Sequence, residues 1–287
     1  MKILLTGAAG FTGRHFVAAA QALGHTVELL LADLMDKPAL NAEVLLAAPD
    51  AVVHLAGISF VGHADDAAFY AVNVVGTTNL LASLATLPKI PKKVLLASSA
   101  NVYGNCEASP INEMQVTAPV NHYAMSKLAM EGMARTYADR LPIVITRPFN
   151  YTGTGHDLNF VIPKLVDHFA KRAPRIALGN LHVEREFNDV HMVCAAYLHL
   201  LNIGAPGETY NVCSGQPHTL QRVIDELARL TQHAMQVEVN PAFVRANELH
   251  RLCGDPRKLQ RLLGQNGIVL RVPSLPTMLQ EMLAAAT

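Results

Sequence analysis

The chain has 287 residues, of which 51% are hydrophobic and 16% are charged. Such a chain can bury one large core or two fused smaller ones, which excludes a disordered or low-complexity protein. Its 23 basic residues balance 23 acidic residues, so no overall field favours nucleic acid or a membrane surface, and we expect a small-molecule partner.

The cysteines and histidines argue against disulfides and metal sites. Cys106, Cys194, Cys213 and Cys253 lie far apart without CxxC spacing, which predicts reduced thiols that pack in the interior. The thirteen histidines show no HxxxH or HExxH grouping, so no metal site is expected. The apolar run after Met1 is too short for a signal peptide, and no apolar run approaches the ~18 residues of a membrane span. We therefore predict a cytoplasmic protein without a membrane contact.

Short apolar runs alternate with longer segments of helical spacing through the first half. Strands are expected at 2–6, 26–32, 51–57, 93–99 and 143–149, and helices at 13–24, 65–87 and 123–140. Strands that are apolar on both faces, separated by amphipathic helices, are typical of a parallel sheet covered on both sides. The sequence thus predicts an α/β fold with a Rossmann-type doubly wound parallel sheet.

The alternation stops after residue 149. A Gly-rich loop, NYTGTGHDLN, is followed by a helix, a stretch with His and Arg, a strand-like run ETYNVCS and two helical segments. We predict a dinucleotide-binding domain over 1–150, with returns near 188–213, and a smaller mixed α/β substrate domain over 151–287.

The stretch TGAAGFTG follows the first strand and opens the first helix. Gly7 allows a tight turn, Gly10 lets the backbone approach a pyrophosphate, and Gly13 lets helix and strand pack closely. Phe11, Thr12 and Arg14 begin the helix whose amides would face the anion. This context indicates a dinucleotide cofactor.

The choice between NAD and NADP depends on the residues at the end of the second strand, where an acidic residue normally selects NAD. Asp33, beside Leu34, could bind the ribose, but its spacing from His54 favours a contact with the adenine amine. Ala32 would then leave room for a 2′-phosphate, with Arg14 either its counter-charge or a solvated residue. We expect NADP(H) to be preferred and NAD(H) to be possible.

Tyr123 and Lys127 lie four residues apart, on one face of a predicted helix. A free tyrosine has a pKa near ~10, and a nearby cation would stabilise its phenolate for proton transfer. A serine hydroxyl from Ser98 or Ser99, at the end of the preceding strand, could help to hold a carbonyl oxygen that gains charge during hydride transfer.

These segments resemble the extended short-chain dehydrogenase/reductases, the NAD-dependent epimerase/dehydratase family, over nearly the whole chain. TGAAGFTG, HLAG (54–57), SSANVYG (98–104), YAMSK (123–127), RPFN (147–150), REFNDV (185–190) and YNVCSG (210–215) carry the resemblance. It implies a catalytic triad of Ser99, Tyr123 and Lys127. His122 departs from the proline that relatives commonly place before the tyrosine, which questions how the helix begins.

The same resemblance extends to cofactor and substrate residues. It implies that Leu55, Ala56 and Gly57 line the cofactor site and that Asn73 supports the active-site helix, although a lone asparagine could equally be a helix-interior hydrogen-bonder. Asn150, Arg185, Arg245 and Glu248 match the blocks that hold a sugar nucleotide, with solvated surface charges as the alternative for the two arginines. A homodimer through helices 65–87 and 123–140 is also expected.

Family dehydratases place an Asp-Glu pair directly after the catalytic serine, where this chain has Ala100 and Asn101. The runs RPFNYTGTGH and GETYNVCSGQ resemble GDP-4-keto-6-deoxy-D-mannose reductases, which implies a GDP-linked keto-sugar as substrate. A 4-epimerase with retained NAD is the alternative. A dinucleotide-binding regulator without catalysis is disfavoured because Tyr123 and Lys127 are both present.

Overall fold

A six-stranded parallel sheet forms the centre of the molecule. The computed structural model describes residues 1–60, 63–240 and 251–286. The sheet has the order β10-β5-β4-β3-β1-β2 and consists of β1 (Lys2–Thr6), β2 (Thr26–Leu29), β3 (Ala51–His54), β4 (Lys93–Ala97), β5 (Ile143–Pro148) and β10 (Thr209–Val212). The five predicted strands are all present, and β2, β3 and β4 end two or three residues earlier than expected because their last residues turn into the site.

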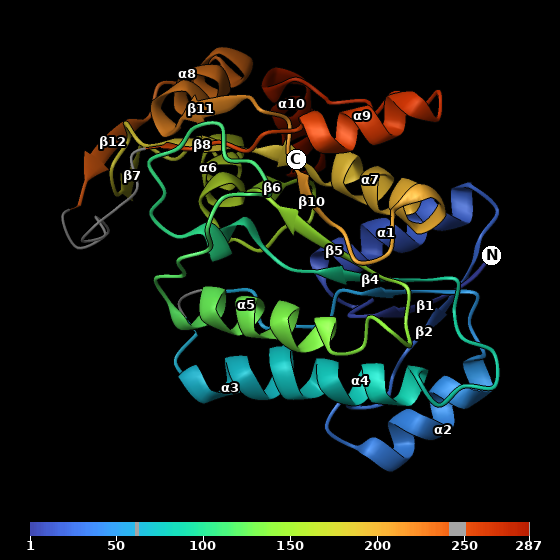
Figure 1. The fold of residues 1–287 in the computed structure, drawn as a ribbon. Helices are drawn as coiled ribbons and strands as arrows, with labels where there is room; N and C mark the ends of the chain where they lie inside the picture. Colours follow the sequence, from blue (N-terminus) through green and yellow to red (C-terminus); the bar gives the residue numbers. More distant parts are fainter. Residues whose placement is uncertain (61–62, 241–250, 287) are drawn as a thin grey trace.

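Helices cover both faces of this sheet (Figure 1). One face packs against α1 (Phe11–Ala22) and α7 (Val190–Ile203), and the other against α2 (Lys37–Ala47), α4 (Thr77–Leu84) and α5 (His122–Arg135). Ile3 and Leu5 face the first layer, while Leu4 between them faces the second, as the alternation of side chains along a strand requires. The predicted doubly wound α/β fold is confirmed.

The predicted helix over 65–87 is a continuous helical segment with a change of pitch. It consists of α3 (Asp66–Tyr70), a π-helical turn η1 (Ala71–Gly76) and α4. By length and composition alone, Asp66–Leu84 could span a membrane, although no apolar run of that length was expected from the sequence. Half of this segment is buried inside the fold. Burial of Leu80, Leu81 and Leu84 against the sheet explains its apolar character.

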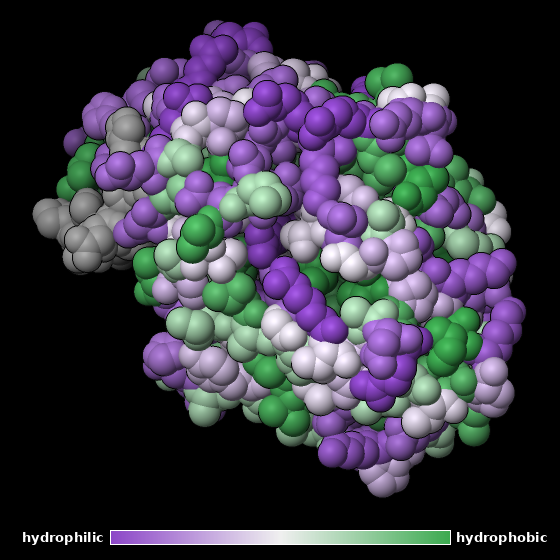
Figure 2. Space-filling view, viewed as in Figure 1, coloured by the Kyte–Doolittle hydropathy of each residue, from purple (hydrophilic) through white to green (hydrophobic). Residues whose placement is uncertain are grey.

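A smaller mixed layer lies beyond the carboxyl ends of the central strands. It contains α6 (Val161–Ala170), α8 (Leu220–Thr231) and α10 (Leu275–Ala286) around one apolar cluster. Its short strands are β6 (Tyr151–Thr152), β7 (Arg175–Leu178), β8 (Glu184–Glu186), β9 (Asn188–Asp189), β11 (Pro217–Thr219), β12 (Gln236–Val239) and β13 (Arg251–Leu252). Figure 2 shows this upper part covered mainly by polar side chains, with more apolar ones over α3, α4 and α5 below.

The chain crosses between the two layers more than once. After β9 it returns through α7 to β10, the edge strand that pairs with β5. Within the described residues, three helices follow β10, namely α8, α9 (Arg257–Gln265) and α10, where the sequence suggested two. Leu259 and Leu263 of α9 pack into the same cluster as α1 and α7, so α9 belongs to the sheet layer. The four cysteines are free and buried, as predicted.

Candidate active site

The glycine loop after β1 has the shape that a dinucleotide requires. Gly7 has a φ of +72°, and a Cβ added there would lie 2.6 Å from the amide nitrogen of Ala56. A Cβ at Gly13 would lie 2.2 Å from the carbonyl oxygen of Gly7, so only glycine lets α1 approach the loop. Among the described residues, no side chain caps the first turn of α1, which leaves its amides available for a pyrophosphate. The chain's own backbone therefore fits a dinucleotide.

Arg14 joins this loop to the Gly-rich segment that follows β5. Its guanidinium donates to the carbonyl oxygens of Ala9 (2.8 Å) and Gly155 (3.1 Å) and stays exposed. Arg14 is therefore more than a solvated surface residue, because its guanidinium already binds two backbone carbonyl groups. Phe11 stacks on His156 with ring centroids 4.2 Å apart, so α1 and the 151–157 segment hold one another.

Thr12 makes the third link between α1 and this segment. Its hydroxyl lies 2.8 Å from the hydroxyl of Tyr151. Burial raises the pKa of Tyr151 to about 12, so this phenol stays protonated. Tyr151 was not among the predicted site residues, and its place at the end of the RPFNY run was the signal that could have identified it.

The end of β2 carries a carboxylate that the sequence analysis missed. Glu43 of α2 accepts hydrogen bonds from the amides of Leu31 (2.8 Å) and Ala32 (2.7 Å). The side chain of Ala32 carries no acid, but the carboxylate of Glu43, from α2, lies against the backbone of Ala32. Asp33 is exposed and accepts from the amide of Met35 (2.9 Å). The distance between 32 and 43 in sequence hid this contact.

Leu34, beside Asp33, is a buried part of this end of the sheet. The carbonyl oxygen of Leu34 accepts from Asn79 Nδ2 (2.8 Å). A Cβ added to Gly76 would lie 3.0 Å from the Cβ of Leu34. The backbone that presents Asp33 is therefore anchored to the η1–α4 helix.

The HLAG segment is held by a chain of buried hydrogen bonds. His54 Nδ1 lies 2.7 Å from Thr6 Oγ1, and His54 Nε2 lies 2.8 Å from Thr77 Oγ1. Burial, and next the charge of Lys127, lower the pKa of His54 to about 3, so the ring is neutral. Thr6 Oγ1 also accepts from the amides of Leu55 (3.2 Å) and Ala56 (3.0 Å), which fixes this loop beside Gly7.

Asn73 occupies the π-helical turn and joins three elements. Its Nδ2 donates to Ser126 Oγ of α5 (3.0 Å) and to the carbonyl oxygen of Ile58 (3.2 Å), while its Oδ1 accepts from the amide of Ile58 (3.0 Å). π turns often occur at functional sites because the extra residue redirects side chains. A Cβ on Gly57 would lie 2.7 Å from Asn73 Oδ1 and 3.3 Å from Lys127 Nζ, so a larger residue there would displace the side chain of Asn73.

Tyr123 and Lys127 lie side by side in the first turns of α5. Both are nearly buried, with 8% and 7% exposed surface. Burial raises the pKa of Tyr123, and a hydrogen bond with Ser99 opposes that rise. Lys127 Nζ donates to the carbonyl oxygen of Ala97 (2.9 Å). Burial lowers the pKa of Lys127 to about 8, against the opposing effect of Glu131.

The two serines at the end of β4 have different partners. Ser98 Oγ donates to Glu131 Oε1 at 2.5 Å and is committed to that carboxylate. Ser99 Oγ faces Tyr123 and also accepts from the amide of Asn101 (3.2 Å) at the start of a 3-10 turn, η2 (Ala100–Tyr103). The arrangement leaves Ser99 as the serine that can share a substrate oxygen with Tyr123.

The histidine before Tyr123 does not disturb the helix. Asn121 caps α5 by accepting from the amide of Ala124 (2.8 Å). His122 Nδ1 lies 2.9 Å from the hydroxyl of Tyr70, and its Nε2 lies 3.4 Å from Asp66. The helix thus begins regularly and is tied to α3 on its outer side.

The predicted substrate residues are only partly described. Asn150 is exposed at the carboxyl end of β5, and its carbonyl oxygen accepts from the amide of Asn188 (2.9 Å). Arg185 lies in β8, paired with His218 of β11, and donates to the carbonyl oxygen of Glu184 (2.8 Å). Arg245 and Glu248 lie outside the described residues.

One group of side chains has the composition of a metal site. Ligand atoms of Asp189, His191 and Glu281 lie within 4.8 Å of one another. Asp189 Oδ1, however, already accepts from the backbone amide (2.6 Å) and the Nδ1 (3.0 Å) of His191 as the cap of α7. A capping role explains this carboxylate.

Comparison with known proteins agrees with this geometry. Residues 18–267 match the family model described as GDP-mannose 4,6 dehydratase. The match spans most of the chain and both structural layers. The chain belongs to this family.

Two relatives in this family cover nearly all of the chain. GDP-6-deoxy-D-talose 4-dehydrogenase of Aggregatibacter actinomycetemcomitans is 35% identical over 98% of this chain and 97% of its own length. GDP-6-deoxy-D-mannose reductase of Pseudomonas aeruginosa is 34% identical over 98% of this chain and 96% of its own length. The predicted membership of the NAD-dependent epimerase/dehydratase group is therefore confirmed.

Two solved structures have the same fold over the whole chain. A Burkholderia cenocepacia J2315 protein provisionally classed as an epimerase is 45% identical, with a TM-score of 0.93 over 99% of this chain and 97% of that one. The structure of RMD from Pseudomonas aeruginosa complexed with NADPH is 32% identical, with a TM-score of 0.91 over 99% of this chain and 98% of that one.

Proposed function

We propose that this protein reduces the 4-keto group of a GDP-linked 6-deoxy-hexulose, GDP-4-keto-6-deoxy-D-mannose, with NAD(P)H. The observation that carries the proposal is the buried group of Ser99, Tyr123 and Lys127. Ser99 lies just after the carboxyl end of β4, and Tyr123 and Lys127 lie in the first turns of α5. The relatives named for GDP-6-deoxy sugars support the substrate class. The predicted cytoplasmic location accords with such an enzyme.

In this proposal each residue of the group has one task. The bound nicotinamide cofactor supplies the hydride. Tyr123 donates its phenolic proton to the carbonyl oxygen, and Ser99 Oγ hydrogen-bonds the same oxygen as negative charge develops. Lys127, charged below a pKa of about 8, stabilises the phenolate that Tyr123 becomes. The shared hydrogen bond of Ser99 and Tyr123 supports a common target for both hydroxyls.

A dehydratase is disfavoured although the family model carries that name. Water elimination needs an acid and a base beyond the tyrosine, and the positions that supply them in family dehydratases are Ala100 and Asn101 here. Ala100 is buried, and η2 as a whole carries no carboxylate. The two positions that supply the acid and the base in family dehydratases thus carry no carboxylate here, whereas Ser99 and Tyr123 offer hydroxyls for a keto reduction.

The second candidate is a nucleotide-sugar 4-epimerase that retains NAD. It is favoured by the similarity to the Burkholderia protein, and it would use the same three residues. Purified protein incubated with GDP-4-keto-6-deoxy-D-mannose and NADPH separates the two candidates. Stoichiometric cofactor oxidation supports the reductase. Absence of cofactor oxidation there, with interconversion of a nucleotide hexose in a separate incubation without added NADPH, supports the epimerase. A regulator that binds a dinucleotide without catalysis would do neither.

For the cofactor we propose NADP(H) as the preferred form and NAD(H) as a possible one. Binding of NADPH by the Pseudomonas structure and the exposed guanidinium of Arg14 support this preference. Glu43 acts against it, because its carboxylate lies at the backbone of Ala32. With NADP(H) bound, Asp33 contacts the adenine, and the loop with Gly7, Gly10 and Gly13 holds the pyrophosphate.

Replacement of Arg14 by alanine is expected to weaken NADPH about tenfold more than NADH. Loss of a charged hydrogen-bond partner costs about 1.5 to 3 kcal/mol, and only NADPH carries the 2′-phosphate. Quenching of cofactor fluorescence measures both dissociation constants, with the exposed surface variant Arg175→Ala as control. Equal weakening of the two cofactors would mean that Arg14 acts only as the link to Gly155, and a wild-type preference for NADH would return Asp33 to the ribose.

The diphosphate of the substrate is expected to meet Arg185, Asn150 and Arg245, with Glu248 at the nucleoside ribose. Planar guanidinium groups bind phosphate oxygens in pairs, and a neutral chain must place such cations individually. Arg245→Ala is therefore expected to raise the KM for the keto-sugar at least about tenfold and to leave NADPH binding unchanged. Steady-state kinetics with both substrates varied measures this, and an unchanged KM would remove the diphosphate from this segment.

We further propose a homodimer through helices 65–87 and 123–140. Val75 of η1 and Met125 of α5 are each 44% exposed. Met130, by contrast, is buried in the core below α5. Some apolar side chains of these helices therefore pack in the core, and others are exposed where a second copy would cover them.

A further inference from the structure

Behind the tyrosine and lysine, α5 carries a buried carboxylate with no assigned task. Glu131 is 0% exposed and lies four residues after Lys127, which places both side chains on the same face of the helix. Its Oε1 accepts from Ser98 Oγ (2.5 Å) and Arg147 Nε (2.9 Å), and its Oε2 accepts from Arg147 Nη2 (2.6 Å). Ser98 and Arg147 thus hold the carboxylate of Glu131, and Lys127 interacts with its charge.

Arg147 explains how a carboxylate is tolerated at this depth. An isolated buried charge is very unfavourable, and a paired guanidinium in two-point contact offsets that cost. Arg147 is itself buried, and its guanidinium lies 4.8 Å above the ring of Tyr103. The pair is therefore held by Ser98, just after β4, on its carboxylate and by the ring of Tyr103, in η2, on its guanidinium.

The hydrogen-bond partner of Lys127 does not balance its charge. Its ammonium group donates to a neutral carbonyl, that of Ala97. Glu131 of α5 and His54 of β3 interact with its charge, Tyr123 lies one helical turn before it, and Asn73 of η1 approaches Gly57 together with it. Tyr123 and His54 are uncharged at neutral pH, since burial raises the pKa of the phenol and lowers that of the imidazole. Among these groups Glu131 is the anion.

We propose that Glu131 is a positioning residue whose carboxylate, held by Arg147 and Ser98, keeps Lys127 protonated at the active site. The proposal rests on the proposed function only for its consequence in catalysis, because Lys127 must be charged to stabilise the phenolate of Tyr123. Burial alone would take the pKa of Lys127 below about 8, and Glu131 opposes that fall. Loss of the carboxylate should therefore deprotonate Lys127 at lower pH.

The test is a direct titration of Lys127 in protein labelled with lysine carrying ¹³C at Cε. The Lys127 signal is assigned by its absence in Lys127→Met, and its shift is followed from pH 5 to 10 in wild type and in Glu131→Gln. We expect the titration midpoint to fall by about one pH unit or more, since loss of a nearby opposite charge at a buried site shifts a pKa by that amount. No substrate is needed, so failure of the proposed function would not affect the result.

A second variant guards against loss of folding, because Glu131→Gln leaves Arg147 buried and unpaired. Glu131→Gln/Arg147→Met removes both charges and is expected to lower the midpoint by a smaller amount, about half a unit. Where the enzyme turns over, the alkaline limb of kcat should move with it. A Lys127 midpoint equal to wild type in the double variant would overturn the proposal.

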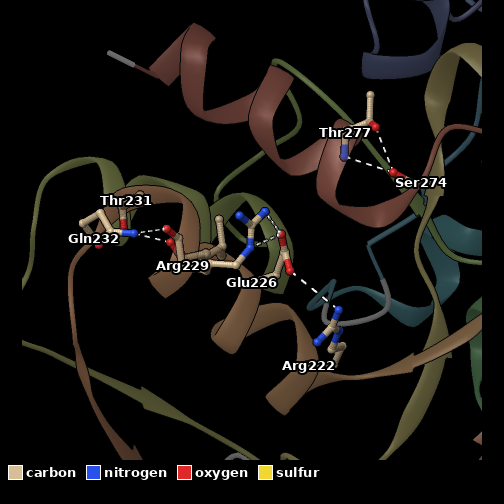
Figure 3. Close-up of polar contacts among 8 residues, drawn as sticks. Arg222, Glu226, Arg229, Thr231, Gln232, Ser274 and Thr277 are labelled. Atoms are coloured by element: carbon tan, nitrogen blue, oxygen red, sulfur yellow. Dashed lines mark hydrogen bonds and ion pairs between the residues drawn. The ribbon is translucent and has the colours of Figure 1, made fainter.

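Glu226→Gln is a matched control for removal of a buried glutamate. Glu226 of α8 is also nearly buried and pairs with Arg229 (2.5 Å) and Arg222 (3.7 Å) on the smaller layer, away from the active site (Figure 3). Its loss should leave the Lys127 midpoint unchanged. An equal shift in this control would assign the effect to general loosening of the fold and would contradict a specific role for Glu131.

Discussion

Replacement of Tyr123 by phenylalanine is expected to lower kcat about 10²- to 10⁴-fold, the range typical of a lost general acid, and to leave the Kd for NADPH nearly unchanged. The ring would keep its place, because the cap by Asn121 and the packing of α5 do not depend on the hydroxyl. Only the proton and the hydrogen bond with Ser99 would be lost. The variant therefore isolates the chemical step from cofactor binding.

Single-turnover oxidation of NADPH in the presence of keto-sugar measures the effect on the chemical step. Tyr137→Phe is the matched control, because it removes a hydroxyl that lies just beyond the other end of α5, beside Arg140. The control should retain wild-type turnover. Turnover of Tyr123→Phe within about threefold of wild type would show that the tyrosine is not the proton donor.

Replacement of Gly13 by alanine is expected to raise the Kd for NADPH about 10- to 100-fold. The new Cβ would lie 2.2 Å from the Gly7 carbonyl oxygen and 2.6 Å from the Cα of Ala8, so the loop or the helix must move. Displacement of a binding backbone by about 1 Å commonly costs such a factor. Isothermal titration with NADPH measures the change.

Gly132→Ala is the control for this substitution. Gly132 also lies in a helix, and a Cβ there meets no atom within 4 Å. Alanine has a higher helix propensity than glycine, so this variant should bind NADPH normally and unfold at a slightly higher temperature. Normal NADPH affinity in Gly13→Ala would contradict a pyrophosphate site at this loop.

The layer of parallel strands and helices was predictable because each element buries one face along a regular period. The runs KILLT and AVVHLAG are apolar on both sides and became central strands, β1 and β3. The π-helical turn at Ala71–Gly76 was not predictable, since AVNVVG has no local signal for an added residue. It is specified by Asn73 and its partners in α5 and after β3, which are contacts between distant segments.

The arrangement of the candidate site residues was predictable where it depends on local spacing. Tyr123 and Lys127 on one helix and the glycines of one loop needed no tertiary information. The different partners of Ser98 and Ser99 were not predictable, because Glu131, which accepts from the hydroxyl of Ser98, is distant in sequence. Glu43 at the end of β2 and the link from Arg14 to Gly155 were missed for the same reason, because their partners are far away in sequence.

The most direct test of the central claim is the fate of the hydride. Purified protein should be incubated with GDP-4-keto-6-deoxy-D-mannose and NADPH that carries deuterium at both C4 positions of the nicotinamide, and the product should be identified by NMR. The account predicts one deuterium at C4 of a GDP-6-deoxy-hexose for each NADPH oxidised. A parallel reaction with unlabelled NADPH keeps H4 in the product, and the proton couplings of H4 will distinguish GDP-rhamnose from GDP-6-deoxytalose. A product without deuterium at C4 in the labelled reaction, or an epimerised sugar formed with no NADPH consumed, would contradict the account.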